Sequence, residues 1–509
     1  MNASNPDAPH PGGAPAALAE PNLFRAPWCP ARLGPHTPVL ALLAAIVVGR
    51  LWIQGHFGLG VDEAHYALYG MLPDWSYFDH PPLVGWVEAL SIRLLGPTNL
   101  GIRLPAILIG FVASWLCYGW LLLLWNDRRM AFVGVAALSA SPLFGALFLM
   151  LLPDTLLCLW IVPILWYVLR VEARGRWSDW AGLGILLGLA GLSKYTSILF
   201  PVAIGVYLVV RGRWDRILTP KALVGVLLAA ALASPVAIWN YQHDWASFAY
   251  QGDHVSGSRT LHLNKFLQSL AAQVGAYSPL LYPVAIFGWI QALRQRSQPA
   301  MLLTAIYGAV IFLFFAAGSF MARALPHWTS PFFLLFVPIG AGELFRRSLA
   351  WKRYTVVAIS LSGLLTAAVH AELRYRFVPF PDYRSLQRDI YGFQEAVARA
   401  AQLIRDPEHE ALAVAQWTLA SRAMFYGRLL GIPVYLVDQR KDQFDLWQSE
   451  PAPGTDLLFL SNHDEPFDVA ARIECDAVEL AEEWDVKVGS HIVDTYRLVW
   501  CRNFRGLKP

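Results

Sequence analysis

The stretch Gly60-Val-Asp-Glu-Ala-His-Tyr66 begins just after the first long apolar run of the chain, which covers residues 38–55. A second polar and aromatic stretch, Asp74-Trp-Ser-Tyr-Phe-Asp-His-Pro-Pro82, follows shortly after it. Elsewhere the chain avoids charge, with 15% charged and 56% hydrophobic residues. Ionisable side chains at the edge of an apolar run are functional candidates in a membrane protein. The two stretches therefore predict a membrane protein and the place of its chemistry.

Similar apolar runs recur along most of the chain. They cover residues 38–55, 104–125, 131–150, 155–170, 181–193, 197–210, 222–240, 266–291, 300–317, 329–345 and 354–372. A helix needs about 20 apolar residues to cross a bilayer, so 181–193 and 197–210 are short for this purpose. The pattern predicts an all-α polytopic membrane protein with about 11 transmembrane helices over residues 38–372.

The connections between these runs alternate in Lys and Arg content. The basic ones carry Arg128, Arg129, Arg170, Arg174, Arg176, Arg211, Arg213, Arg216, Lys221, Arg294, Arg296, Arg346, Arg347, Lys352 and Arg353. The opposite connections, 60–103, 241–265 and 318–328, are longer but poorer in cations. By the positive-inside rule the basic side is cytoplasmic. Residues 1–37, rich in Pro, Ala and Gly, are then a disordered cytoplasmic tail, and the chain after residue 373 lies outside.

Residues 373–509 have a different character. Apolar residues first recur at helical spacing over 386–404, and short β-type runs at 411–415, 434–437, 456–460 and 491–500 then follow, with a helix near 418–430. This pattern predicts a periplasmic α/β domain. The cluster from Arg440 to Trp447 allows two interpretations, a substrate contact or a solvated loop that packs one Trp.

Cys475 and Cys501 both lie in this outer region, where an oxidising compartment permits a bridge. Two interpretations stay open, a disulfide or two small buried side chains. The net charge of +3 is too small to indicate a nucleic-acid partner.

Acids, cations and aromatic rings gather in the connections on the predicted outer side. A leaving phosphate gains negative charge as its bond to a sugar C1 breaks, and Lys or Arg stabilises that charge. A carboxylate can take the proton of an acceptor hydroxyl. The set therefore suits a reaction between a lipid-borne sugar phosphate and a hydroxyl at the membrane edge.

The candidate residues fall into three groups. The catalytic candidates are Asp62, Glu63 and Asp154; the phosphate-binding candidates are Lys194, Tyr195, Arg323 and His327; the sugar- or acceptor-binding candidates are His65, Tyr66, Trp75, Tyr77, Asp79 and His80. Simpler roles stay open for several of them. An acid at a helix start can act as a cap, and a lysine near the interface can reach lipid head groups. The histidines lack convincing ligand spacing for a metal, so no metal and no cofactor is expected.

The sequence resembles the bacterial family 39 glycosyltransferases of the GT-C fold, relatives of the dolichyl-phosphate-mannose protein mannosyltransferases and of the lipid A aminoarabinose transferase. The matching pieces are Asp62-Glu63, Asp74–Pro82, Pro153-Asp154, Gly191-Leu-Ser-Lys-Tyr-Thr196, Ile238-Trp-Asn-Tyr-Gln-His-Asp-Trp245 and Leu325-Pro-His-Trp328. They occur in the order of the family. The chain lacks the large β-trefoil insert of the eukaryotic protein mannosyltransferases.

The resemblance implies an inverting transfer of one sugar from a polyprenyl-phosphate donor to a cell-envelope acceptor (lipid A, glycan or protein) at the periplasmic face of the inner membrane, among membrane lipids. It implies that Asp62 is the base, that Asp154 positions a substrate and that Lys194 binds the donor phosphate, with weaker carry-overs for Arg323 and His327. If the acceptor is itself a phosphate, no proton is removed and Asp62 acts electrostatically. The family generally needs no catalytic metal.

Two other functions remain as alternatives. A polymerase or ligase for lipid-linked oligosaccharides uses similar donors, but such enzymes usually depend on arginines in a large outer loop, and loop 241–265 has only Arg259 and Lys265 as cations. A lipid-sugar transporter is expected to carry ionisable residues deep within its spans and symmetry between its halves. The sequence shows neither feature.

Overall fold

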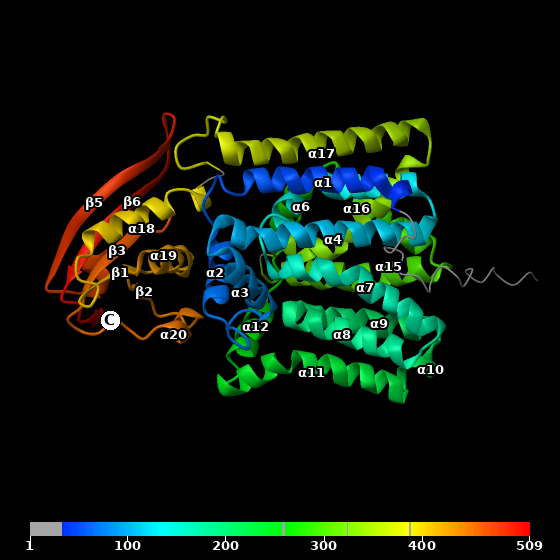
Figure 1. Ribbon diagram of the computed structural model, residues 1–509, viewed down its shortest axis with the longest axis horizontal. Helices are drawn as coiled ribbons and strands as arrows, with labels where there is room; N and C mark the ends of the chain where they lie inside the picture. The colour runs from blue at the N-terminus through cyan, green and yellow to red at the C-terminus, as the bar shows by residue number, and fades with distance from the viewer. Residues whose placement is uncertain (1–32, 257–259, 323, 386–387, 509) are drawn as a thin grey trace, which may run out of the picture.

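The computed structural model describes residues 33–256, 260–322, 324–385 and 388–508. Residues 1–32, which make up most of the predicted tail, and Arg323 lie outside this part of the chain. Figure 1 shows a bundle of long helices with a sheet-containing domain at one end. We call that end of the bundle, where α2 (Val61–Met71), α3 (Leu83–Leu95) and the C-terminal domain lie, the domain end.

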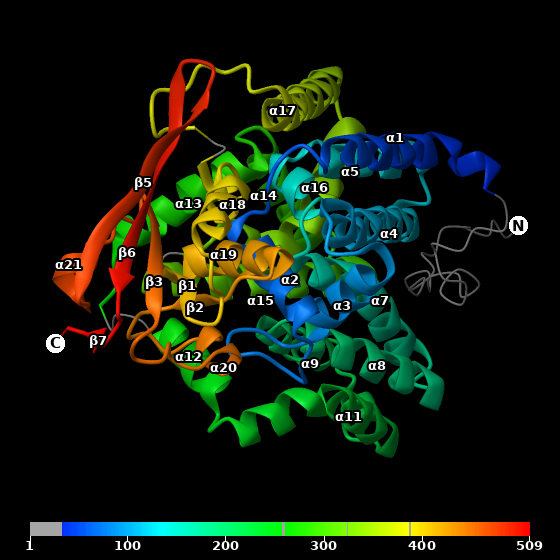
Figure 2. The same cartoon turned by 60° about the vertical axis from the view of Figure 1, so that its left-hand side comes forward.

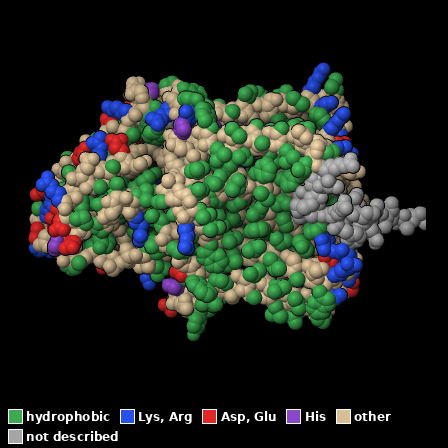
Figure 3. Space-filling view, viewed as in Figure 1, with side chains coloured by type: hydrophobic (Ala, Val, Ile, Leu, Met, Phe, Trp, Pro, Cys, Tyr) green, Lys and Arg blue, Asp and Glu red, His purple; other side chains and the backbone are tan. Residues whose placement is uncertain are grey.

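Within the described residues, seven helices are long and apolar enough to cross a membrane, and one bent pair has the composition of either a broken span or a re-entrant loop. The seven are α1 (Thr37–Ile53, continued from η2, Gly34–His36), α4 (Asn99–Trp125), α7 (Pro153–Ala173), α11 (Pro220–Gln242), α15 (Pro299–Ser319), α16 (Ser330–Phe345, preceded by η4, Pro326–Thr329) and α17 (Leu349–Tyr375). The bent pair is α13 (Leu263–Tyr277) and α14 (Leu281–Arg294), which meet at 100°. Figure 3 shows the apolar surface that these helices form.

Each of the eleven apolar runs coincides with helical structure, but three form shorter helices. These are α5 (Arg128–Ala140), α8 (Trp177–Ser193) and α9 (Leu199–Val210, preceded by η3, Tyr195–Ile198). The run 131–150 is broken at Ser141, where the backbone is extended and Pro142 begins the separate α6 (Pro142–Leu147). A proline lacks the N–H that would continue the helix. Small residues let α8 pack closely on α11, since a Cβ on Gly184 would lie 2.2 Å from the Gly225 carbonyl oxygen.

The two ends of the bundle differ in charge. The basic connections, including α10 (Trp214–Ile217), lie at the end away from the C-terminal domain, where Figure 3 shows Lys and Arg side chains gathered. The domain end holds the connection 60–103, in which α2 and α3 form, and α12 (Ala246–Ser256). The sequence analysis treated 60–103 as a loop and missed both helices.

The C-terminal domain contains a five-stranded sheet in the order β2-β1-β3-β6-β5. Its strands are β1 (Glu410–Val414), β2 (Val434–Leu436), β3 (Asp456–Asn462), β5 (Ala477–Val488) and β6 (His491–Arg502), and β4 (Ile473–Glu474) pairs separately with β7 (Gly506–Leu507). Its helices are η5 (Arg388–Ile390), α18 (Phe393–Leu403), α19 (Trp417–Leu430), α20 (Phe444–Trp447) and α21 (Val469–Arg472). β1 runs parallel to β2 and β3, whereas β6 runs antiparallel to β3 and β5. The predicted small α/β domain is present, and the sequence pattern indicated β1, β2, β3 and β6 but not β5 or the short β4 and β7.

The C-terminal domain packs directly on α2. Ala64 and Leu68 of α2 share one apolar core with Ala420 and Ala423 of α19, and all four side chains are fully buried. Figure 2 shows α19 lying over α2. Burial of a leucine stabilises a fold by roughly 1.5–3 kcal/mol, so this core fixes the position of the helix that carries Asp62 and Glu63.

Candidate active site

A buried ion pair lies at the domain end of the bundle. Asp154 is in the first turn of α7, where the helix dipole favours an acid. Lys194 follows α8 in an extended conformation, and its Nζ lies 2.7 Å from both carboxylate oxygens of Asp154. Lys194 is 7% exposed and Asp154 is 2% exposed. An ammonium has three donors, so one N–H of Lys194 remains for another acceptor.

His327 lies beside this pair. Its Nε2 is 3.8 Å from an oxygen of Asp154, within ion-pair range when the imidazole is protonated. η4 holds this side chain just before α16 begins, and the Trp328 ring centroid lies 5.9 Å from Lys194 Nζ. Two basic groups therefore face one carboxylate at the start of three helices.

Asp62 and Tyr66 lie one turn apart on α2, so they share a face of that helix. Burial raises the pKa of Tyr66 well above its ordinary value, and the charges of Asp62, Asp79 and Asp154 raise it further. The charges of all three carboxylates therefore act on the Tyr66 hydroxyl. Asp62 is half-buried, and within the described ranges no hydrogen bond or ion pair holds its carboxylate.

Asp79 forms a second cluster on the loop after α2. It accepts a hydrogen bond from the Tyr69 hydroxyl, and the His80 Nδ1 lies 3.0 Å away. The His65 Nε2 lies 3.4 Å from the same carboxylate. Burial alone would raise the pKa of the Asp79 carboxyl, but the interactions with His65 and then His80 hold it well below its ordinary value. Asp79 is therefore a stable anion that orients two imidazoles.

Helix α11 and the segment after it hold the loop 72–82 in place. The Trp239 indole N–H donates to Asp74, at 2.9 Å, and Ser247 donates to the Tyr77 carbonyl at 3.0 Å. The Gln251 amide donates to the Asp79 carbonyl at 2.8 Å. These polar contacts determine where the Asp79 cluster lies.

The C-terminal domain also contacts this loop. The Phe78 N–H donates to the Gln443 side chain at 2.6 Å. A cleft of about 40 Å³ separates the two parts, and it is lined by His65, Phe78, Asp79, Tyr250, Trp417, Arg440, Asp442, Gln443 and Phe444. The cluster at 440–447 thus lies against the candidate site.

Glu63 has a different place from the one expected. Its carboxylate receives two hydrogen bonds from Arg103, at 2.6 and 2.7 Å, and one from the Gly60 N–H at 3.2 Å. Arg103 also donates to backbone carbonyls of residues 54, 57 and 58. Both side chains are buried, so Glu63 joins α2 to α4 and does not face the Asp154 pair.

The aromatic candidates also divide by burial. Tyr77 is fully buried, stacks on Tyr69 at 3.5 Å between ring centroids and donates to a backbone carbonyl, which suits a structural role better than contact with a sugar. Trp75 is 57% exposed. Tyr195 is half-buried, and its ring centroid lies 5.7 Å from that of Phe248.

The sequence pattern did not indicate the contacts that several residues of this arrangement make. Arg103, Trp239, Ser247 and Gln443 act through contacts between segments distant in sequence. The match at 238–245 had already drawn attention to Trp239 as a motif residue. Nothing in the chain marked its bond to Asp74.

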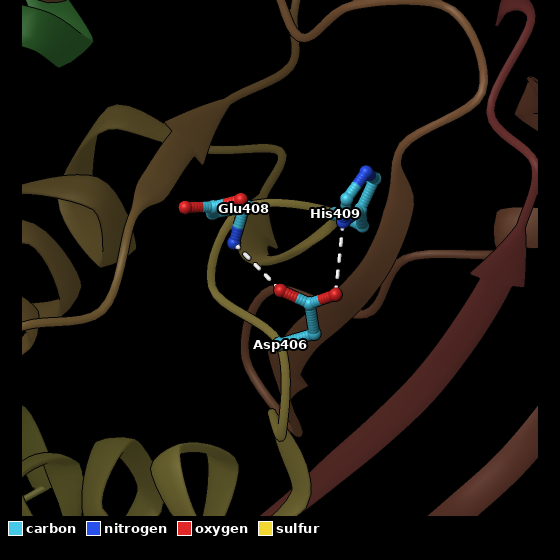
Figure 4. A group of neighbouring side chains, drawn as sticks. All are labelled: Asp406, Glu408 and His409. Carbon is cyan, nitrogen blue, oxygen red and sulfur yellow. Dashed lines mark hydrogen bonds and ion pairs between the residues drawn. The ribbon is translucent and has the colours of Figure 1, made fainter.

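One group in the described ranges has the spacing of a metal site, Asp406, Glu408 and His409, all exposed on the turn between α18 and β1. Figure 4 shows that Asp406 accepts from the Glu408 N–H and pairs with His409 at 2.8 Å, which are the bonds of a tight turn. This group lies in the C-terminal domain and includes none of the predicted site residues. Cys475 and Cys501 form a disulfide between β6 and the segment just before β5.

Comparisons with known proteins agree with this architecture. The family described as dolichyl-phosphate-mannose-protein mannosyltransferase matches residues 79–239. The lipid A galacturonosyltransferase RgtD of Rhizobium johnstonii is 23% identical over 317 residues, which cover 60% of this chain and 64% of that protein. An undecaprenyl phosphate-α-4-amino-4-deoxy-L-arabinose arabinosyl transferase of Pseudomonas paraeruginosa is 25% identical, over 66% of this chain and 61% of its own length. The match thus spans less than two thirds of either relative.

The fold is similar over nearly the whole chain to a solved structure. ArnT from Cupriavidus metallidurans, crystallised with undecaprenyl phosphate, superposes with a TM-score of 0.61 and 17% identity, over 92% of this chain and 98% of ArnT. Its apo form gives a TM-score of 0.60. The chain therefore has a fold like that of ArnT, and the sequence matches agree with the resemblance to the family 39 glycosyltransferases.

Proposed function

We propose that this protein transfers a single sugar from a polyprenyl-phosphate-linked donor to a cell-envelope acceptor, with lipid A as the leading candidate. The observation that supports it most is the buried Lys194–Asp154 pair, which lies at the same end of the bundle as Asp62. The charges of both acids act on Tyr66. The names of the similar proteins refer to lipid A and to undecaprenyl phosphate. A donor anchored in lipid requires a site at this boundary.

Lys194 is proposed to bind the donor phosphate through its remaining N–H. Asp154 keeps the ammonium in place with two 2.7 Å contacts, and His327 adds a second basic group. As the bond between the sugar C1 and the phosphate oxygen breaks, the electron pair stays on that oxygen. The resulting charge is stabilised by donors that are already in position.

Asp62 is proposed to act on the acceptor. A hydroxyl oxygen attacks C1 from the face opposite the phosphate, so the configuration at C1 inverts, and its proton passes to the Asp62 carboxylate. The half-buried position of Asp62, without an internal ion pair among the described residues, leaves the carboxylate available for this role. An acceptor phosphate would attack without losing a proton, and Asp62 would then position it electrostatically.

The charge distribution supports an orientation. The basic end of the bundle is proposed to face the cytoplasm, together with the N-terminus, by the positive-inside rule. Residues 38–372 would then form the catalytic membrane domain of an inner-membrane protein, and 373–509 a periplasmic domain. A disulfide in that domain fits an oxidising compartment.

The test begins with mass spectrometry of the lipids that co-purify with the protein, which names the donor sugar. The donor found is then supplied, with lipid A, to proteoliposomes that contain the wild type, Asp62→Asn or the control Asp244→Asn. Asp244 is an exposed acid at the same end, in a left-handed conformation that Asn tolerates. We expect transfer by the wild type and the control, and loss of transfer by Asp62→Asn at normal expression.

Two results would contradict the proposal. Normal turnover by Asp62→Asn would remove this acid from the mechanism. Products with several added sugars, or donor that crosses the bilayer intact, would indicate a polymerase or a transporter.

A further inference from the structure

A cavity of about 680 Å³ lies at the domain end, apart from the residues of the candidate site. Its walls come from the segment after α1, which includes Gly58, from Arg376 after α17 and from the C-terminal domain, which contributes Tyr391, Glu395, Asp485 and Lys487. This volume lies within the range of small-molecule sites, roughly 300–1,000 Å³. A smaller cavity of about 210 Å³ is also lined by Arg376.

Arg376 is the charged group of this cavity that lacks an internal counter-ion. Its guanidinium stacks on the Tyr391 ring, 3.9 Å from the centroid, and within the described ranges no carboxylate pairs with it. The other charges are compensated, since Lys487 lies 3.3 Å from Asp485, and Glu395 is bound by Arg399 at 2.8 Å. Burial lowers the pKa of Arg376 from its ordinary value, and its Nε is buried without a hydrogen-bond partner in this part of the chain.

The backbone at Arg376 points to a role for the side chain. This residue caps α17 with φ of +53°, a conformation in which glycine is the usual choice. An arginine at a position that favours glycine indicates that its side chain has a function, and we look for that function in the cavity that the side chain lines.

A second arginine, Arg374, lies two residues before Arg376 in the last turn of α17. Arg374 lies 4.4 Å over the ring of Trp52, and it also has no carboxylate partner in the described ranges. Trp52 and Tyr375 are 51% and 59% exposed, as is common for aromatic side chains at a membrane interface. Figure 3 shows basic and histidine side chains near the border between the apolar surface and the C-terminal domain.

We infer that this cavity binds the phosphorylated head group of the acceptor lipid, with Arg376 as a phosphate ligand and Arg374 beside it at the interface. A planar guanidinium matches the geometry of a phosphate, and its stacking on an aromatic ring leaves its donors free for one. This inference rests on the proposed function, in which the donor phosphate occupies the site at Lys194. A second phosphate site then belongs to the other substrate.

The chain connects the cavity to the candidate site over a short distance. Gly58 lines the cavity and Asp62 follows four residues later, so their Cα atoms are at most about 14 Å apart. Arg103 binds the Gly58 carbonyl and the Glu63 carboxylate, which makes this connection rigid. A sugar-phosphate head group held here is close enough to present a reacting group near Asp62.

The test compares lipid A with dephosphorylated lipid A as acceptors for the full-length protein. We expect Arg376→Gln to raise the KM for lipid A about tenfold, the loss expected for one charged hydrogen bond, while kcat and the donor KM stay unchanged. The KM for dephosphorylated lipid A should not change. Arg376→Gly should behave alike and be at least as stable as the wild type, because its backbone favours glycine. Arg353→Gln, at the other end of α17, is the matched control.

Direct binding separates this inference from the proposed function. Native mass spectrometry with the same two lipids needs no turnover, and Arg376→Gln should lose preference for the phosphorylated form even if no transfer is detected. An unchanged KM and unchanged binding of lipid A would overturn the inference. So would an equal effect on both acceptors, or a loss of bound phosphatidylglycerol alone, which would mark the cavity as a site for bulk lipid.

Discussion

Replacing Lys194 by methionine keeps the length of the side chain but removes the charge that faces Asp154. The carboxylate, 2% exposed and held by two contacts of 2.7 Å, is then buried without its cation. Removal of one partner of a buried ion pair costs about 3–5 kcal/mol. We expect Lys194→Met to lose this much free energy of unfolding. The double variant Lys194→Met/Asp154→Leu should regain most of it, because neither charge remains.

Activity should not follow stability in this series. Loss of a charged hydrogen bond to the donor phosphate costs about 1.5–3 kcal/mol, which is roughly a 10- to 150-fold loss in kcat/KM. The double variant should therefore be stable and nearly inactive. Chemical unfolding in detergent and single-sugar transfer in proteoliposomes measure the two quantities.

Lys265→Met serves as the control, since within the part of the chain that the structure describes Lys265 donates to the Met321 carbonyl alone, at the same end of the protein. It should cost about 1 kcal/mol. The reasoning is refuted if Lys194→Met is as stable as the wild type, or if the effects of the Lys194 and Asp154 substitutions simply add. An active double variant would show that the ion pair has a structural role alone and that Lys194 does not bind the donor.

Three further predictions concern stability. Glu63→Gln should lower the free energy of unfolding by about 3 kcal/mol, because Arg103 loses a buried counter-ion. Asp62→Asn should lower it only slightly. Equal costs of the two substitutions in unfolding measurements would contradict the different roles of these neighbours. Asp442 has a pKa raised to about 6, mainly by burial, with one carboxylate oxygen buried and unbonded in the described ranges. Because the pKa of Asp442 is raised in the folded state, the contribution of this residue to the free energy of unfolding is most favourable below the unfolded pKa. That contribution is lost as pH rises through about 6. Asp442→Asn should thus stabilise the protein at pH 8 and not at pH 4, and a difference independent of pH would argue against this. Finally, the Cys475–Cys501 bridge closes a loop with a sequence separation of 26, so its loss should cost about 3.5 kcal/mol by the loop-entropy relation; unfolding of Cys475→Ser/Cys501→Ser at the wild-type midpoint would disprove the contribution.

The C-terminal domain is part of the candidate site and not a separate appendage. Its helix α19 shares a buried core with α2, and Gln443 binds the loop that carries Asp79. Any movement of this domain therefore shifts the Asp79 cluster. The cavity at Arg376 lies at the same junction, so its walls also depend on the position of the C-terminal domain.

Much of the architecture was predictable because local patterns carry it. A helix in lipid must satisfy its own backbone groups and present apolar side chains, so each apolar run coincides with helical structure whatever its neighbours are. The change of period after residue 373 likewise predicted the α/β domain. Helix breaks were less visible: the end of α5 at Ser141 and the bend between α13 and α14 depend on packing as well as on composition.

The roles of the individual acids depended on tertiary structure. The sequence by itself placed Asp62, Glu63, Asp79, Asp154 and Lys194 near one membrane surface, because charged residues are confined to the ends of apolar helices. It did not determine which carboxylate meets which cation, since Arg103 follows Glu63 by 40 residues and Lys194 follows Asp154 by the same number. Only the contact between α2 and α4 and the packing of α7 on α8 decide these pairs. Glu63 is thereby bound by Arg103 within the fold, whereas the carboxylate of Asp62, its neighbour on the helix, has no ion-pair partner among the described residues.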